Sequence, residues 1–232
     1  MAWDNMLAVG LFMGLVGLVI LIILWPNDKR GARLLVRWGV PDPDAAEVAI
    51  AVRYLKRRRF WYPWLYLGLP QLFGSNDGSA AIVGTLLLGG LIAEVLAQRP
   101  ARGPQREAVL VRRTLRDVVP VWALVLSGLA SAGAVVHLIL TRQWPLLAVA
   151  VGTTVACWAI TLLAVRRPPA GEPRADLALR CRSARVAIGL GIGTCTAIGW
   201  TQGNLGSLLI VVVGIAAFLA VTAPLKRLPA LA

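Results

Sequence analysis

The alternation of uncharged apolar runs with arginine-rich blocks is the feature that most constrains this chain. Several runs of about twenty residues carry no charge, and a helix of that length crosses about 30 Å of hydrocarbon. Between the runs lie blocks at 29–59, 99–116 and 166–185, which hold nine, six and six basic residues. The chain is 58% hydrophobic and 15% charged, whereas soluble domains carry about 25% charged residues. The sequence therefore predicts an all-α polytopic membrane protein.

Seven spans are expected, and they form one transmembrane domain over residues 1–232 with no separate soluble domain. The run at 60–74 is short and contains two prolines, but a re-entrant loop there would put the flanking basic blocks on opposite sides. The first run has no cleavage pattern and is expected to be retained. The expected spans are about 6–25, 60–74, 80–98, 118–140, 146–165, 186–200 and 205–223, which leaves basic loops at 26–59, 99–117 and 166–185.

The distribution of basic residues predicts the orientation of these spans. If the three basic loops and the C-terminal tail lie inside, 23 of the 24 lysines and arginines face the cytoplasm and only Arg142 lies outside. Because positive residues are retained on the cytoplasmic side, the N-terminus is expected outside and the C-terminus inside. Arginine outnumbers lysine by 21 to 3, a bias typical of GC-rich bacteria. We therefore expect a multi-pass protein of a bacterial inner membrane.

The first basic block contains a predicted amphipathic helix. Asp42 is expected to cap it and Pro43 to occupy its first helical position. From Ala45 to Leu55 the apolar residues recur at helical spacing, while Arg53, Lys56 and Arg57 fall off that stripe. This pattern favours a helix lying on the cytoplasmic membrane surface with its arginines towards anionic lipid.

An internal repeat is also predicted. The segment 96–113 resembles 163–181, and residues 47–53 fit the same frame more weakly. Each copy precedes a pair of expected spans. The architecture would then be one leading helix followed by three units of surface helix and helical hairpin. The alternative is chance similarity between arginine-rich loops.

Residue types that carry chemistry are few. The single histidine, His137, excludes HExxH and histidine-cluster metal sites, and the chain contains no phosphate-binding P-loop and no GxSxG motif. The cysteines Cys157, Cys181 and Cys195 have no metal-binding or CxxC spacing. We expect no metal, no cofactor and no enzymatic chemistry. Nucleic acid is not expected as a partner despite the net charge of +13, because every basic block adjoins an apolar run.

Polar residues near or inside the apolar runs are the candidate substrate contacts. Glu94 is an acid within a run, where an ionisable group is a functional candidate, although an arginine from a neighbouring loop is an alternative partner. The runs at 60–74 and 186–200 are both short and interrupted, as in transporters that bind substrate between such helices; close packing through small residues is the alternative. The candidate contacts are Gln71, Asp77, Glu94, His137, Arg142, Thr194 and Thr196.

The function expected from these features is that of a non-catalytic membrane subunit or scaffold. It would contact anionic headgroups at the cytoplasmic face and pack with other membrane subunits or further copies of itself. One alternative is a small transporter with its substrate site between helices 2 and 6. Another is a membrane-embedded, lipid-acting enzyme. The candidate contacts with lipid or a partner are Arg53, Arg57, Arg112, Arg116, Arg180 and Arg185.

Overall fold

The described part of the chain is mainly helical and contains no strand. The structure is a computed structural model, and it describes residues 2–23, 25–68, 87–95, 114–166, 172–200, 205–225 and 228. Residues 87–95 are helical. The other helices are α1 (Ala2–Ile23), α2 (Asp28–Arg37), α3 (Ala45–Phe60), α4 (Tyr62–Gly68), α7 (Leu115–Val118), α8 (Val121–Leu140), α9 (Trp144–Arg166), α10 (Pro173–Gly199) and α11 (Leu205–Thr222).

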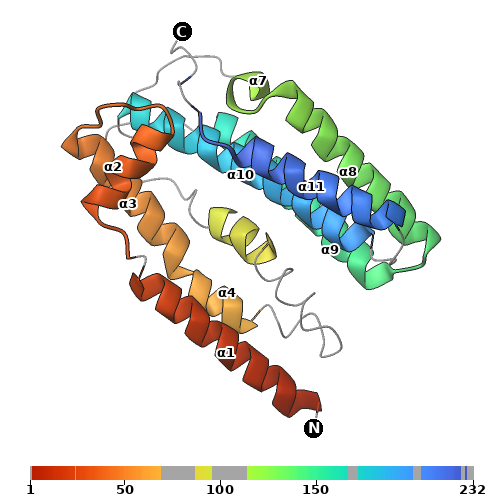
Figure 1. Cartoon of the computed structure of the whole chain (residues 1–232). Coiled ribbons are helices and arrows are strands. Elements are labelled where there is room, and N and C mark those ends of the chain that lie inside the picture. The colour runs from red at the N-terminus through yellow and green to blue at the C-terminus, as the bar shows by residue number, and fades with distance from the viewer. Residues whose placement is uncertain are drawn as a thin grey trace.

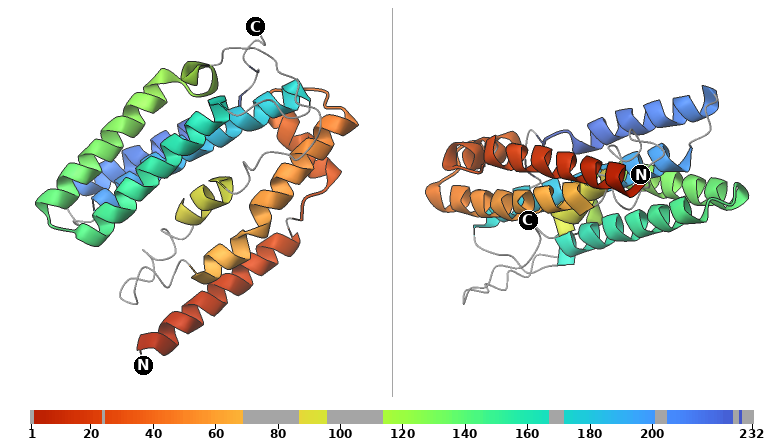
Figure 2. Two further views of the ribbon diagram at one scale, coloured as in Figure 1. Left: turned by 180° about the vertical axis from the view of Figure 1, so that it is seen from behind. Right: turned by 90° about the horizontal axis from the view of Figure 1, so that it is seen from below.

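The helices form two groups that meet along α10. In the first group α3 and α4 run back alongside α1 (Figure 1), and α4 packs against α1. In the second group α8, α9 and α11 surround α10, which is buried along most of its length (Figure 2). The segment 87–95 lies between the two groups (Figure 1). The largest apolar core lies within the second group and includes Cys157, Ile160 and Ile188.

Three helices are long and apolar enough to cross a membrane, namely α8, α9 and α11. A fourth span results if Gly10–Ile23 and Asp28–Arg37, which meet at 91°, are counted together. These findings indicate a membrane protein. The limits of α8, α9 and α11 agree with the spans expected at 118–140, 146–165 and 205–223, except that α8 begins only after Pro120. Proline cannot donate a backbone hydrogen bond, so it is tolerated at a helix start.

The basic segment expected at 166–185 is largely helical, and its helix differs from the expectation in continuing without a break into the expected span at 186–200. Residues 173–199 form the single helix α10, with Glu172 as its N-cap and Pro173 in its first turn. A helix of 27 residues is about 40 Å long, which exceeds the hydrocarbon thickness of about 30 Å. The arginine-rich half of α10 therefore continues the apolar half as a rigid extension.

The amphipathic helix in the first basic block is present as α3, but its start and its surroundings differ from the prediction. Asp44, not Asp42, is the N-cap: its carboxylate accepts from the Glu47 amide at 2.7 Å, while the Glu47 carboxylate accepts from the Asp44 amide at 3.0 Å. This capping box satisfies two donors at the helix start. The apolar face of α3 is covered by α2 and α10 and therefore does not lie on lipid.

A second, smaller core lies at the arginine-rich end of the molecule. We call the helices that build it, α2, α3 and residues 173–185 of α10, the headpiece. Gly31 of α2 sits so close to α3 that an added Cβ would lie 2.7 Å from Val52. The buried residues of this smaller core are Leu35, Trp38, Val40, Ala51, Ala175 and Ala178. The headpiece is joined to the membrane helices through the unbroken α10.

Glycine at position 214 allows α11 to approach α10 closely. A Cβ at this position would lie 2.6 Å from the Cβ of Thr196, whereas a Cβ at Gly152 would meet nothing within 4 Å. We expect Gly214→Ala to lower the free energy of unfolding by about 1–3 kcal/mol because overpacking displaces neighbouring atoms. Thermal unfolding in mild detergent measures this, with Gly152→Ala as the control. Equal melting temperatures for the two variants would contradict the close packing.

Candidate functional site

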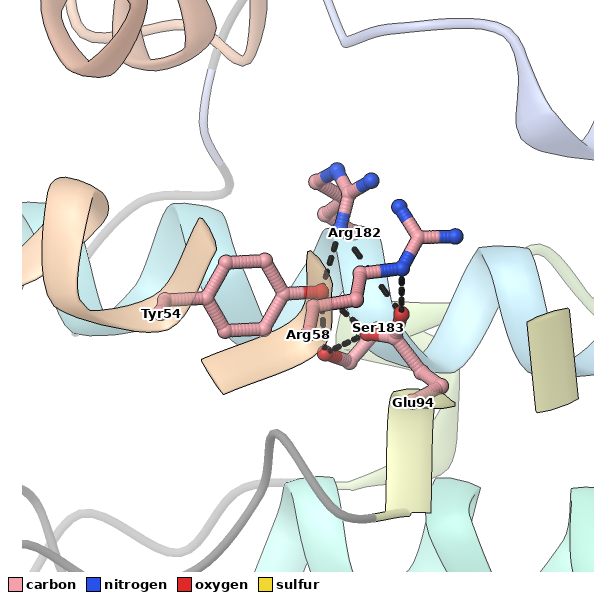
Figure 3. A network of polar contacts seen from close by, with 5 residues as sticks. All are labelled: Tyr54, Arg58, Glu94, Arg182 and Ser183. Carbon is pink, nitrogen blue, oxygen red and sulfur yellow. Dashed lines mark hydrogen bonds and ion pairs between the residues drawn. The ribbon is translucent and has the colours of Figure 1, made fainter. Parts of the chain in front are cut away.

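A buried carboxylate forms the centre of the charged cluster where the headpiece meets the membrane helices. Glu94, on the helical segment 87–95, is fully buried. Its Oε1 accepts hydrogen bonds from the hydroxyls of Tyr54 and Ser183. Its Oε2 lies 3.0 Å from Nε of Arg58 and 3.8 Å from Nη1 of Arg182 (Figure 3). Three separate parts of the chain are thereby joined through one side chain.

Tyr54 orients this cluster. Its hydroxyl donates to Glu94 and accepts from Arg182, whose guanidinium carbon lies 5.2 Å from the tyrosine ring centroid. Burial raises the pKa of the Tyr54 phenol above its usual range. The hydroxyl therefore keeps its proton at neutral pH and remains a donor to Glu94.

The helix register explains why these residues meet. Tyr54 and Arg58 are four residues apart on α3 and share one face. At the opposite end of the same helix pair, Glu47 of α3 lies 3.6 Å from Arg174 of α10. Glu47 contacts Arg174, and Tyr54, further along α3, contacts Arg182, further along α10. The helix α3 therefore runs parallel to the first half of α10.

The cluster lies at the level where α1 ends. A Cβ added at Gly14 of α1 would lie 3.2 Å from Leu67 of α4, which runs back alongside α1. The helix α3, which carries Arg58 in its last turn, lies beyond the start of α4, in the direction in which α1 runs towards its end at Ile23 (Figure 1). Glu94 and Arg182 share this level through their contacts with Arg58 and with each other.

Three further arginines bind backbone carbonyls at helix ends near this level. The last carbonyls of a helix have no partner within it, and a cation there also meets the negative end of the helix dipole. Arg30 donates to Ile23 O at 2.8 Å and to Trp25 O at 3.1 Å, at the end of α1. Arg180 donates to Ala164 O at 3.0 Å, in the last turn of α9.

Arg185 does the same for two more helices. Its Nε lies 3.4 Å from Val118 O at the end of α7, and its Nη1 lies 3.4 Å from Ala223 O just after α11. We call Arg30, Arg58, Arg180, Arg182 and Arg185 the arginine layer. Its guanidiniums bind helix ends or the buried Glu94.

The surroundings of Glu94 suit a structural role better than acid–base chemistry. Glu94 has no exposed surface, and hydrogen bonds and two guanidiniums stabilise its charged form. A general acid or base needs access to its substrate. No group of three or more His, Cys, Asp or Glu side chains within the described ranges is placed to hold a metal ion.

Glu94 is one of the candidate substrate contacts expected from the sequence, with an arginine of a neighbouring loop as its alternative partner. The structure pairs Glu94 with Arg58 and Arg182. Of the arginines expected to contact lipid or a partner, Arg53, Arg57 and Arg116 are exposed. Arg180 is only 1% exposed and pairs with Asp176 at 2.6 Å, so its guanidinium faces protein instead of lipid.

The other candidate substrate contacts do not converge with Glu94. His137 stacks on Trp200 at the far end of the bundle, with ring centroids 4.5 Å apart, and Arg142 is exposed in the turn between α8 and α9. Thr194 and Thr196 are two residues apart on α10 and therefore point to different sides. The expected contacts Gln71, Asp77 and Arg112 lie outside the described residues.

An apolar groove of about 320 Å³ lies between α8, α10 and α11. Thr196 contributes to its lining, but its hydroxyl donates to Ile192 O at 2.9 Å within its own helix. Leu129, Val213 and Trp200 are among the other lining residues. Ligand pockets usually combine apolar walls with several converging polar groups, and this lining does not provide them.

Tyr54, Arg58, Arg182 and Ser183 were not singled out from the sequence. The four-residue spacing of Tyr54 and Arg58 could have indicated from the sequence that both lie on one helical face. The pairing of α3 with α10 could not be predicted from the sequence, because it joins segments 128 residues apart. Comparison with protein families, with characterised proteins and with solved structures finds no match to this chain.

Replacing Glu94 with glutamine tests the buried cluster. We expect Glu94→Gln to lower the free energy of unfolding by about 3–5 kcal/mol, because two guanidiniums then remain buried without their carboxylate. Unfolding in mild detergent measures the loss, with the exposed Asp42→Asn as the control. A double-mutant cycle with Arg58→Gln should be non-additive by more than about 0.5 kcal/mol. Additive effects would mean that the pair is not coupled.

Arg180 offers a separate test of the helix-end contacts. Arg180→Lys keeps the charge, but one ammonium cannot reproduce the bond to Asp176 together with the bond to Ala164 O. We expect a loss of about 1–3 kcal/mol in the same unfolding measurement. The exposed Arg53→Lys should be neutral. If the two lysine variants unfold alike, the guanidinium geometry is unimportant.

Proposed function

We propose that this protein is a non-catalytic, seven-span subunit or scaffold of a bacterial inner-membrane complex. The observation that carries the proposal is the arginine layer. Its guanidiniums connect the headpiece to the membrane helices and leave the buried carboxylate neutralised. Such a construction supports a rigid membrane body with a fixed extramembrane headpiece.

The directions of the described helices support the proposed threading. Helices α1, α9 and α11 end at the arginine-rich end, while α8 and α10 begin there. Two further crossings, one through α4 and one through 87–95, complete an alternation of seven. Because arginines are retained on the cytoplasmic side, this end is assigned to the cytoplasm and the N-terminus to the outside.

The internal repeat remains a prediction. Residues 96–113 of its middle copy lie outside the described residues. In the predicted frame Glu47 matches Arg174, and these two residues form an ion pair between parallel helices. Two repeats of surface helix and helical hairpin that are threaded in the same direction would have parallel surface helices. The parallel packing of α3 with the start of α10 agrees with this expectation.

Two observations favour a scaffold over the alternatives. A lipid-acting enzyme that used Glu94 would need this carboxylate at an accessible site, and Glu94 is fully buried. Asp77, the other acid that such an enzyme could use, lies outside the described residues. A transporter site between helices 2 and 6 would need those helices adjacent. The described part of helix 2, which includes α4, packs mainly on α1, and α10 is surrounded by α8, α9 and α11. Large apolar side chains such as Leu11, Phe12 and Leu15 are left exposed along α1. They form a face for lipid or another membrane subunit.

Site-directed labelling tests the threading. The three native cysteines are buried, so a cysteine introduced at the exposed Gln143 or Ala46 can be labelled selectively. On intact cells an impermeant maleimide should react with Gln143→Cys but not with Ala46→Cys, which should react only after lysis. Labelling of both positions from outside would overturn the assigned topology.

Isolation from native membranes tests the subunit role. After cross-linking and extraction in mild detergent, we expect a stable complex with another membrane protein or a second copy of this chain. Native mass spectrometry gives the composition, with uncross-linked material as the control. A monomer in both samples would contradict the proposal.

A further inference from the structure

Helix α2 is held at the membrane boundary by contacts with the end of α1. It meets Gly10–Ile23 at 91°. Asn27 caps it by accepting from the Arg30 amide at 3.0 Å, and the Arg30 side chain binds Ile23 O and Trp25 O. A helix perpendicular to a span that ends there runs along the membrane surface.

The two faces of α2 are chemically different. Gly31 and Leu35 are buried against α3. The face away from that contact exposes Lys29, Arg33 and Arg37, which follow one another at intervals of four residues, or about 6 Å. Within the part of the chain that the structure describes, no hydrogen bond or ion pair engages these three side chains. The arginines of the arginine layer, in contrast, bind helix ends or the buried Glu94.

Exposed apolar side chains accompany the three cations. Trp25, just before α2, is 51% exposed, and Val36, which lies two turns after Lys29 on the same side of the helix, is 50% exposed. Tryptophan is enriched where protein crosses the level of lipid headgroups. A face that mixes cations with such side chains suits the boundary between headgroups and acyl chains.

We propose that the exposed face of α2 binds anionic phospholipid headgroups, with Lys29, Arg33 and Arg37 contacting successive phosphodiesters. This inference rests on the proposed function, since it places the arginine-rich end at the cytoplasmic leaflet. It assigns the headgroup contact to α2, whereas Arg180 and Arg185 bind helix ends within the protein. Each cation near an anionic leaflet raises the affinity of such a segment for that surface roughly fivefold.

A fluorescent probe at position 36 tests the contact locally. Val36→Cys is exposed while the native cysteines are buried, so the full-length protein takes one environment-sensitive NBD label. The protein is reconstituted in nanodiscs of phosphatidylcholine, with or without phosphatidylglycerol. We expect a blue shift of the NBD emission and protection from dithionite only with phosphatidylglycerol. Both effects should weaken as salt is raised.

Charge-matched variants identify the residues. Lys29→Gln, Arg33→Gln and Arg37→Gln together should abolish the response to phosphatidylglycerol. The control removes three exposed charges from α3, at Arg53, Lys56 and Arg57, and should leave the response of the probe at position 36 in place. All six positions are exposed, and circular dichroism and gel filtration verify that each variant folds.

Three outcomes would overturn the inference. The first is a probe that stays aqueous in both lipids. The second is a response that the α3 variant abolishes and the α2 variant keeps. The third is protection of the probe by a co-purifying acidic protein in place of lipid. Labelling of position 143 on intact cells reports the threading separately, so a correctly threaded protein with an aqueous probe in the nanodiscs would refute this inference alone.

Discussion

The unsatisfied carbonyls at the ends of membrane helices are the constraint on which this structure depends. A helix end buried without partners is unfavourable, and at the edge of the hydrocarbon water reaches it only in part. Here Arg30, Arg180 and Arg185 supply donors to the ends of α1, α9 and α11. The same positively charged side chains thus complete the hydrogen bonding at the ends of these helices.

The same arginines determine how the headpiece is attached. Arg182 and Arg58 converge on Glu94 from two helices that run parallel, and Tyr54 connects the three groups. The carboxylate satisfies guanidiniums that would otherwise be buried without a counter-charge. Sequence positions far apart are therefore held in one register by electrostatics as well as by the apolar contacts of Leu55 and Leu179.

Apolar length and charge placement were enough to predict the helical class and the limits of α8, α9 and α11. They were not enough for α10, because the arginines at 174–185 suggested a solvated loop, whereas Pro173 and the helix-forming residues after it continue the apolar helix outwards. Glu94 was recognised as unusual from its position in an apolar run. Its partners were not, since Tyr54 and Arg182 approach it only through the packing of α3 on α10.

The unbroken course of α10 has a mechanical consequence. The helix runs without a break from Pro173 to Gly199, so its two halves have no interruption at which they could bend independently between Glu172 and Trp200. There the helix borders the apolar groove, and Trp200 stacks on His137. The headpiece and one wall of that groove are therefore parts of the same continuous helix.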